Sequence, residues 1–167
     1  LISIVREDVG KTETTHNRAP WIKKLWPSTD YEEGYENKEP YCAAGMAHAL
    51  HSWIFRLAGM GELRNTLGMG TKDADKWRCK SARAFGWRDW AKEKGIKMLD
   101  ESSPAKPGDF VVYDFSHIGL VVKQVNKSTI LTQEYNTNDG GSREGDGCWE
   151  KQRATKLVQC YIRVLTW

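Results

Sequence analysis

The stretch PYCAAGMAHALHSWIFRLAG, residues 40–59, predicts a long helix with one buried face. Its apolar side chains recur at the 3.6-residue spacing of a single helical stripe: Met46, Leu50, Trp53 and Leu57. Cys42 lies four residues before the first of them, so its thiol should point toward whatever the helix packs on. It also occupies the first turn, where free N–H groups and the helix dipole favour a thiolate. We expect the helix to span Cys42–Leu57 and to stop at Gly59.

Working outward from this helix, the sequence changes from helical to β character after Pro104 and Pro107. Segments rich in β-branched and aromatic residues, separated by turn residues, predict five strands: Phe110–Tyr113, His117–Lys123, Thr129–Tyr135, Cys148–Arg153 and Val158–Leu165. Further short helices are predicted at Asn17–Leu25, Ala74–Phe85 and Trp87–Lys94, whereas Thr29–Tyr41 reads as a loop. Helices followed by an antiparallel sheet indicate an α+β fold, in one domain that spans residues 1–167.

A histidine and two polar side chains stand at the ends of neighbouring strands. Side chains alternate along a strand, so His117 and Gly119 share a face, and the glycine leaves room beside the imidazole. A hairpin centred near Asn126 places His117 opposite Glu134 and Asn136, which also share a face. A catalytic histidine needs such an acceptor to hold its tautomer and to stabilise its cation.

Together these residues predict a nucleophilic site, with Cys42 as nucleophile and His117 as base. We prefer Asn136 to Glu134 for the direct contact with His117, because a buried carboxylate beside a thiolate would raise the cysteine pKa. Position alone leaves simpler interpretations open: Cys42 as a small core residue and His117 as a surface histidine.

The other cysteines are expected to be inert. Cys79 falls in a predicted helix and Cys160 in a late strand, where buried thiols are common. Cys148 and Cys160 could form a disulfide if their strands were neighbours.

At the residues of this predicted site the sequence resembles the CHAP and NlpC/P60 cysteine peptidases that cut bacterial cell walls. The matching pieces are NRAPWIKKLW (17–26), PYCAAGMAHAL (40–50), KPGDFVVYDFSHIGLVV (106–122) and QEYNTNDGGSREGDGCWEKQR (133–153). The resemblance implies a papain-like (NlpC/P60/CHAP) fold, with N-terminal helices packed on the sheet. It assigns the nucleophile to Cys42, the base to His117 and polar partners to Glu134 and Asn136. Many relatives have Trp before the cysteine, where this chain has Tyr41, a candidate subsite or oxyanion group.

The implied activity is a phage endolysin-like, bacteriolytic hydrolysis of amide bonds in peptidoglycan stem peptides. It would be that of an endopeptidase or an N-acetylmuramoyl-L-alanine amidase, with no organic cofactor. Two alternatives from other classes stay open: an inactive wall-binding or structural phage module of the same fold, and a cysteine protease that acts on a protein. We expect a monomer that works at the cell wall, in the periplasm or outside the cell. Residues 1–9 show no signal-peptide core, so phage-type delivery is also considered.

Composition argues against two other classes of partner. The net charge is +3, and the basic residues are scattered rather than massed, unlike the stripes of nucleic-acid binders. No stretch approaches the roughly 20 apolar residues that a membrane span needs.

Candidate metal ligands are weak. His48 and His51 are expected to face solvent rather than to form a zinc pair. Asp30, Glu32 and Glu36 offer oxygen ligands for calcium, but their order does not match an EF-hand loop, and a solvated acidic loop is favoured.

Two further features of the sequence bear on a substrate cleft. The glycine-rich segment 137–147 lacks a phosphate-loop pattern and is interpreted as a hairpin connection beside the active site. Among eight tryptophans, Trp53 and Trp90 fit the core, whereas sugar-binding candidates are Trp21, Trp26 and Trp87.

Overall fold

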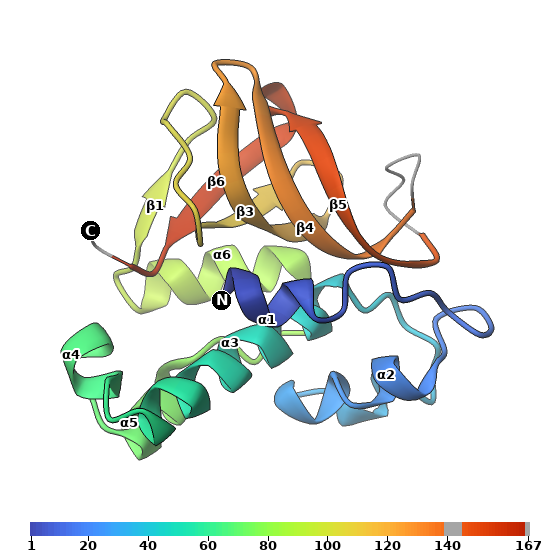
Figure 1. Cartoon of the computed structure of the whole chain (residues 1–167), viewed down its shortest axis with the longest axis horizontal. Coiled ribbons are helices and arrows are strands. Elements are labelled where there is room, and N and C mark those ends of the chain that lie inside the picture. The colour runs from blue at the N-terminus through green and yellow to red at the C-terminus, as the bar shows by residue number, and fades with distance from the viewer. Residues whose placement is uncertain (139–144, 166–167) are drawn as a thin grey trace.

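The computed structural model describes residues 1–138 and 145–165, and the helices lie against one side of a curled antiparallel sheet (Figure 1). Within these residues the sheet has six strands in the order β1-β6-β2-β3-β4-β5. Their bounds are β1 Lys97–Leu99, β2 Phe110–Tyr113, β3 His117–Asn126, β4 Thr129–Thr137, β5 Gly147–Ala154 and β6 Val158–Arg163. The predicted α+β fold is confirmed, although the short strand β1 was not predicted from the sequence.

The helices are α1 Ile2–Arg6, α2 Pro20–Lys23, α3 Cys42–Gly59, α4 Leu63–Leu67, α5 Thr71–Trp77 and α6 Ala84–Glu93. Single 3-10 turns occur at η1 Trp26–Ser28, η2 Glu32–Gly34 and η3 Thr155–Leu157. The central helix α3 begins at Cys42, as its hydrophobic spacing predicts. The helix predicted at Asn17–Leu25 starts late, because Asn17 has a positive φ of 54° and uses its side chain to bond Lys38 O.

The helix predicted at Ala74–Phe85 is wrong, because the chain leaves helix α5 at Trp77. The next residue, Arg78, turns away from helical geometry and buries its side chain, which donates a 2.6 Å hydrogen bond to Ser28 O. The following loop is held by the Trp87 Nε1 bond to Ser81 O, and α6 then starts at Ala84. Contacts with distant parts of the chain thus override the local periodicity.

Helices α3 and α6 pack on one face of the sheet, and their contacts form the larger core. Its largest fully buried side chains include Met46, Leu50, Ile54, Trp87 and Phe110. Gly45 lets helix α3 approach β4, because a Cβ there would collide with the Tyr135 ring. This close approach brings the first turn of α3 to the end of β4. No helix of the described residues is long and apolar enough to cross a membrane.

The opposite face of the curled sheet holds a second, smaller core. Strand alternation explains it, since Val111 belongs to this core and its neighbour Val112 to the larger one. The second core consists of Ala105, Val111, Tyr113, Val121, Ile130, Val158 and Tyr161. Glu134 and Arg153 contact each other beside Tyr113, so this core borders the polar groups at the strand ends.

Residues 8–17, which we call the N-terminal strap, run beside the start of β5. Backbone hydrogen bonds join Gly10 and Lys11 to Cys148, and another joins Glu13 to Asp146. Because β5 and β6 are separated in the sheet by three other strands, Cys148 does not lie beside Cys160. The disulfide considered from the sequence is therefore wrong, and all four cysteines are free thiols.

Candidate active site

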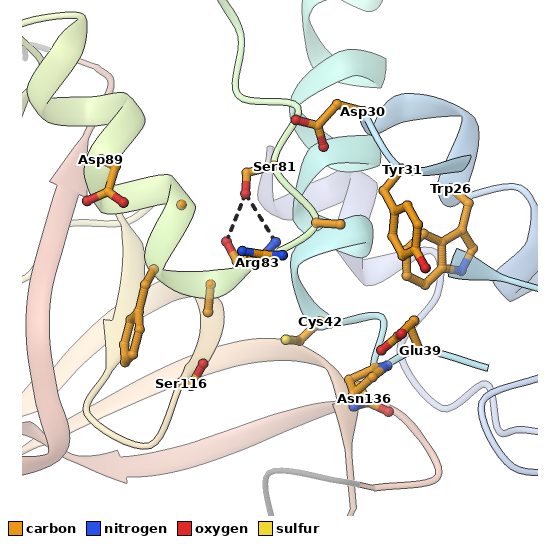
Figure 2. A pocket seen from close by; sticks show the side chains of 15 residues that line it. Trp26, Asp30, Tyr31, Glu39, Cys42, Ser81, Arg83, Asp89, Ser116 and Asn136 are labelled. Carbon is orange, nitrogen blue, oxygen red and sulfur yellow. Dashed lines mark hydrogen bonds between the residues drawn. The ribbon is translucent and has the colours of Figure 1, made fainter. Parts of the chain in front are cut away.

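Cys42 lines a cleft with a cavity volume of about 880 Å³ (Figure 2). It is the first residue of α3, and its side chain is only 7% exposed. The first intrahelical bond of α3 starts at Gly45 N, so the N–H of Cys42 is not used by the helix. A nucleophilic atom and a backbone donor that the helix does not use therefore lie together at the start of α3.

His117 is the first residue of β3 and is fully buried. Its Nε2 lies 3.0 Å from Glu134 Oε2, while Nδ1 bonds no nitrogen or oxygen of the residues described. The Cys42 thiol and the same ring shift each other's pKa. Nδ1 is thus the ring nitrogen that is available to the thiol.

The two groups shift each other's protonation. Burial alone would raise the pKa of Cys42, but the charge and hydrogen bond of His117, with backbone hydrogen bonds from Ile118 and Ala43, hold it below its ordinary value. Burial would likewise lower the pKa of His117, yet the charge and hydrogen bond of Cys42, together with Glu134, raise it to about 9. Both directions favour a thiolate beside an imidazolium.

Glu134, rather than Asn136, makes the direct contact with His117, so the preference derived from the sequence is wrong. Burial would raise the pKa of Glu134, but hydrogen bonds from Arg153 and His117 and the charges of both hold it well below its ordinary value. The carboxylate therefore stays ionised although it is fully buried. It is positioned to hold the His117 tautomer and to stabilise its cation.

Three residues that the sequence reading missed fix the Glu134 carboxylate. The Tyr113 hydroxyl donates to Oε1 at 2.9 Å, and Thr132 Oγ1 donates to the same oxygen at 2.6 Å. Arg153 reaches both oxygens, with Nε 2.9 Å from Oε1 and Nη2 bonded to Oε2. Two features of the sequence point to this arrangement. Arg153 is a charged residue inside a predicted strand, and Thr132 lies two residues before Glu134.

Asn136 lies in the cleft wall near Cys42 (Figure 2). Its side chain is fully buried, yet neither Oδ1 nor Nδ2 has a hydrogen-bond partner among the described residues. The backbone adopts a positive φ of 55°, which asparagine tolerates better than most residues. An unpaired buried carboxamide that faces a cleft is suited to bind a substrate peptide group.

Tyr41 does not lie in the cleft, contrary to the expectation of a subsite or oxyanion group. Its ring is fully buried, packs edge-on against Trp21, and its hydroxyl donates to Glu13 Oε1 at 3.1 Å. Glu13 belongs to the N-terminal strap, so Tyr41 anchors the strap to the start of α3.

The cleft has two walls that flank Cys42 (Figure 2). The lining comes from two parts of the chain: Trp26, Asp30, Tyr31 and Glu39 precede α3, and Ser81, Arg83, Phe85 and Asp89 follow it. Of the tryptophans considered for sugar binding, only Trp26 lines this cleft. Trp87 is fully buried against Phe110, and Trp21 packs on Tyr41 and Tyr135.

The side chains of the calcium candidates Asp30, Glu32 and Glu36 are exposed and are not gathered into a site. Glu36 pairs with Arg18 instead. Within residues 1–138 and 145–165, no group of three or more His, Cys, Asp or Glu side chains is arranged to hold a metal ion.

Two other expectations meet different outcomes. His48 and His51 are half-buried rather than solvent-facing, and both place Nδ1 near Ser28 Oγ, at 3.3 and 3.4 Å.

The predicted connection 137–147 falls largely on residues 139–144, outside the described residues.

A comparison with protein families finds one match that covers this site. A family model described as the CHAP domain matches residues 31–136, more than half of the chain. The matched segment contains Cys42, His117, Glu134 and Asn136, and it ends before Arg153. No curated protein matches the chain.

Proposed function

The chain belongs to the CHAP domain family, whose members are amidase- and peptidase-type peptidoglycan hydrolases, and on that premise we propose that it cleaves an amide bond of peptidoglycan with Cys42 as nucleophile. The observation that carries the proposal is that Cys42 lines a cleft and interacts with the buried His117 behind it, whose Nε2 lies 3.0 Å from Glu134 Oε2. A buried structural cysteine would need neither a charged histidine nor a cleft.

The first half of the reaction forms a thioester. The Cys42 thiolate attacks the carbonyl carbon, and the electron pair of the C=O bond moves to the oxygen, which the Cys42 backbone N–H stabilises. The His117 imidazolium then donates its proton to the departing amine as the C–N bond breaks. Glu134 holds the ring in place through Nε2 while Nδ1 exchanges the proton.

The second half regenerates the enzyme. His117, now neutral, takes a proton from a water molecule that attacks the thioester carbonyl. The C–S bond breaks, the carboxylate product leaves, and the thiolate–imidazolium pair is restored. Each of these steps is served by side chains and backbone, so activity should persist after dialysis against EDTA.

We place the peptide part of peptidoglycan, rather than the glycan, in the cleft. Its walls carry acidic side chains at Asp30 and Glu39 and a basic one at Arg83, which complement the amino and carboxylate groups of stem peptides. The unpaired carboxamide of Asn136 is suited to a peptide N–H or C=O. An endopeptidase, or an amidase that cuts at the start of the stem, fits this cleft.

Purified cell walls test the proposal directly. Wild-type protein should release soluble fragments, whereas Cys42→Ser should release almost none, because His117 would have to remove a proton of much higher pKa. Mass spectrometry then distinguishes free stem peptides, the product of an amidase, from shortened stems or split cross-links. Walls from several bacterial types left intact by a wild-type protein whose Cys42 is inert to iodoacetamide would support a wall-binding module instead.

A further inference from the structure

Arg153 lies on β5, outside the segment matched by the CHAP model, yet it contacts the candidate active site. Its side chain is 7% exposed, and its guanidinium bonds both oxygens of Glu134. Nη2 also donates to Thr137 Oγ1 at 3.3 Å. The guanidinium carbon lies 5.5 Å from the Tyr113 ring centroid and 5.7 Å from that of Phe115. The guanidinium is therefore held on three sides.

The aromatic rings extend this arrangement to the histidine. Phe115 and His117 are stacked at 5.8 Å with 12° between their planes, and Tyr113 and His117 at 6.0 Å with 20°. Arg153 and His117 thus share the same two aromatic neighbours and the same carboxylate. The cation on β5 and the imidazole on β3 are linked through Glu134 rather than through direct contact.

We propose that Arg153 is a positioning residue that keeps Glu134 ionised, aims it at His117 Nε2, and sets the pH range over which Cys42 is a thiolate. The inference rests on the proposed function only in taking Cys42 as the nucleophile. A buried carboxylate near the thiolate would by itself raise the pKa of Cys42, and Arg153 counteracts this effect. Its positive charge balances Glu134, so the thiolate is not exposed to an uncompensated negative charge.

Removal of the Arg153 charge has two consequences that shift Cys42 in the same direction. Where Glu134 stays ionised, its uncompensated charge makes the thiol harder to deprotonate. Where Glu134 instead takes up a proton, the imidazolium loses its stabilising anion and the neutral thiol–imidazole pair is favoured. In both cases the thiolate forms at higher pH.

Other charged groups near the site enter the same balance. Glu134 faces the hydroxyl of Tyr113 from β2 and the ring of His117 from β3, in addition to Arg153 from β5. Cys42 faces His117, and the charged groups of the cleft walls are Asp30, Glu39, Arg83 and Asp89. Of these groups, only Arg153 hydrogen-bonds to both oxygens of the Glu134 carboxylate.

The test is the rate at which iodoacetamide alkylates Cys42, measured by peptide mapping across pH 4–10 or so, a range set by the ordinary pKa values of carboxyl and thiol groups. This readout needs no cell wall, so it stands even if the substrate proposal fails. Cys42 is distinguishable from the other thiols, because burial raises the pKa of each of them. The pKa of Cys79 rises to about 12 and that of Cys160 to about 11, and the pKa of Cys148 is also raised.

In Arg153→Met, the pH at which the alkylation rate of Cys42 reaches half its maximum should rise by about one unit. At any pH below this midpoint, that shift means a tenfold smaller fraction of thiolate. Arg163→Met is the matched control. Arg163, on β6, makes a similar pair of hydrogen bonds to both oxygens of Asp109, at 2.9 and 2.7 Å, in a part of the sheet away from Glu134. It should lose stability in a comparable way but keep the wild-type midpoint.

A folded Arg153→Met protein with the wild-type midpoint would overturn the proposal and leave Arg153 a purely structural residue. If Arg153→Met does not fold, the variant pair Glu134→Gln and Glu134→Gln/Arg153→Met decides, because the double variant leaves no buried carboxylate unpaired. Equal midpoints in that pair support action through Glu134. A further upward shift in the double variant contradicts it, since Arg153 would then act on Cys42 directly.

Discussion

Gly119 and Glu134 face each other across β3 and β4 so closely that a Cβ at position 119 would lie 2.7 Å from Glu134 Cγ. The glycine leaves the space that the carboxylate side chain occupies on its way to His117. The sequence predicts room for another group beside His117, and Glu134 is that group.

Gly119→Ala should therefore disturb the site. The new methyl group pushes Glu134 away from His117 Nε2, and a displacement of about 1 Å in such a site can cost about 10²-fold in rate. We expect kcat on cell walls to fall at least tenfold, a loss of about 1.4 kcal/mol of transition-state stabilisation. Gly59→Ala, where the added Cβ meets nothing within 4 Å, is the control and should leave kcat unchanged. Equal kcat values for the two variants would show that Glu134 tolerates the shift.

Glu134→Gln should lower kcat more than any change at Asn136. A glutamine keeps the size of the side chain but offers His117 no negative charge, and loss of the corresponding group in other hydrolases costs up to about 10⁴-fold. We expect a fall of about 10²-fold or more. The measurement is kcat at saturating substrate, with circular dichroism as a check of folding. A larger fall for Asn136→Gly would restore the original preference for Asn136.

Asn136→Gly should separate activity from stability. Glycine adopts the positive φ of this residue without strain, and the carboxamide has no bond to a described residue to lose. The free energy of unfolding should change by less than about 1 kcal/mol. If the carboxamide binds substrate, kcat/KM should fall about tenfold, the value of one lost hydrogen bond of about 1.4 kcal/mol. Unchanged kcat/KM would exclude Asn136 from substrate binding.

The parts of this molecule that the sequence predicts well are those in which local pattern and tertiary packing agree. Helix α3 carries its own buried stripe, and strand β2 is a short run of apolar and aromatic residues between turns. The helix predicted at Ala74–Phe85 fails, because Arg78 bonds Ser28, a residue fifty positions away. No local periodicity records such a contact.

The candidate site shows the same limit. The spacing in the sequence predicts that Cys42, His117 and Glu134 lie close together, and in the structure they do. The choice between Glu134 and Asn136 failed, since it rested on the repulsion of an unpaired carboxylate. Arg153, nineteen positions further along the chain, removes that repulsion. The sequence alone does not predict an ion pair between two strands, because the pairing depends on the strand register.

On the alkaline side, the rate of hydrolysis should fall only at an unusually high pH. The reaction needs a thiolate and an imidazolium, so activity rises as Cys42 loses its proton and falls as His117 loses its own. The pKa of Cys42 lies below its ordinary value and that of His117 is raised to about 9, so the alkaline midpoint is expected near pH 9. A midpoint of kcat/KM near the ordinary histidine value of 6.5 would contradict the ion pair.

Thermal stability should follow the protonation of His117 and Glu134. The raised pKa of His117 gives stability that is complete below about pH 6.5 and is lost as the pH rises through about 9. The lowered pKa of Glu134 gives stability that is present above its ordinary value of 4.5 and is lost as the pH falls. We therefore expect Tm to be highest between these limits and to decline on both sides. A Tm that keeps rising above pH 9 would show that the folded state does not favour the imidazolium.

Tyr41→Phe tests whether the residue before the nucleophile acts in catalysis or only in the fold. The change removes the 3.1 Å hydrogen bond to Glu13 and should lower the free energy of unfolding by about 1 kcal/mol. Tyr161→Phe is the matched control, because its buried hydroxyl has no hydrogen-bond partner in the described part of the chain and its loss should cost nothing. Since the Tyr41 hydroxyl points to the N-terminal strap, kcat should stay within about twofold of wild type, whereas loss of an oxyanion donor costs about 10²- to 10³-fold. A hundredfold fall in kcat with unchanged stability would return Tyr41 to the active site.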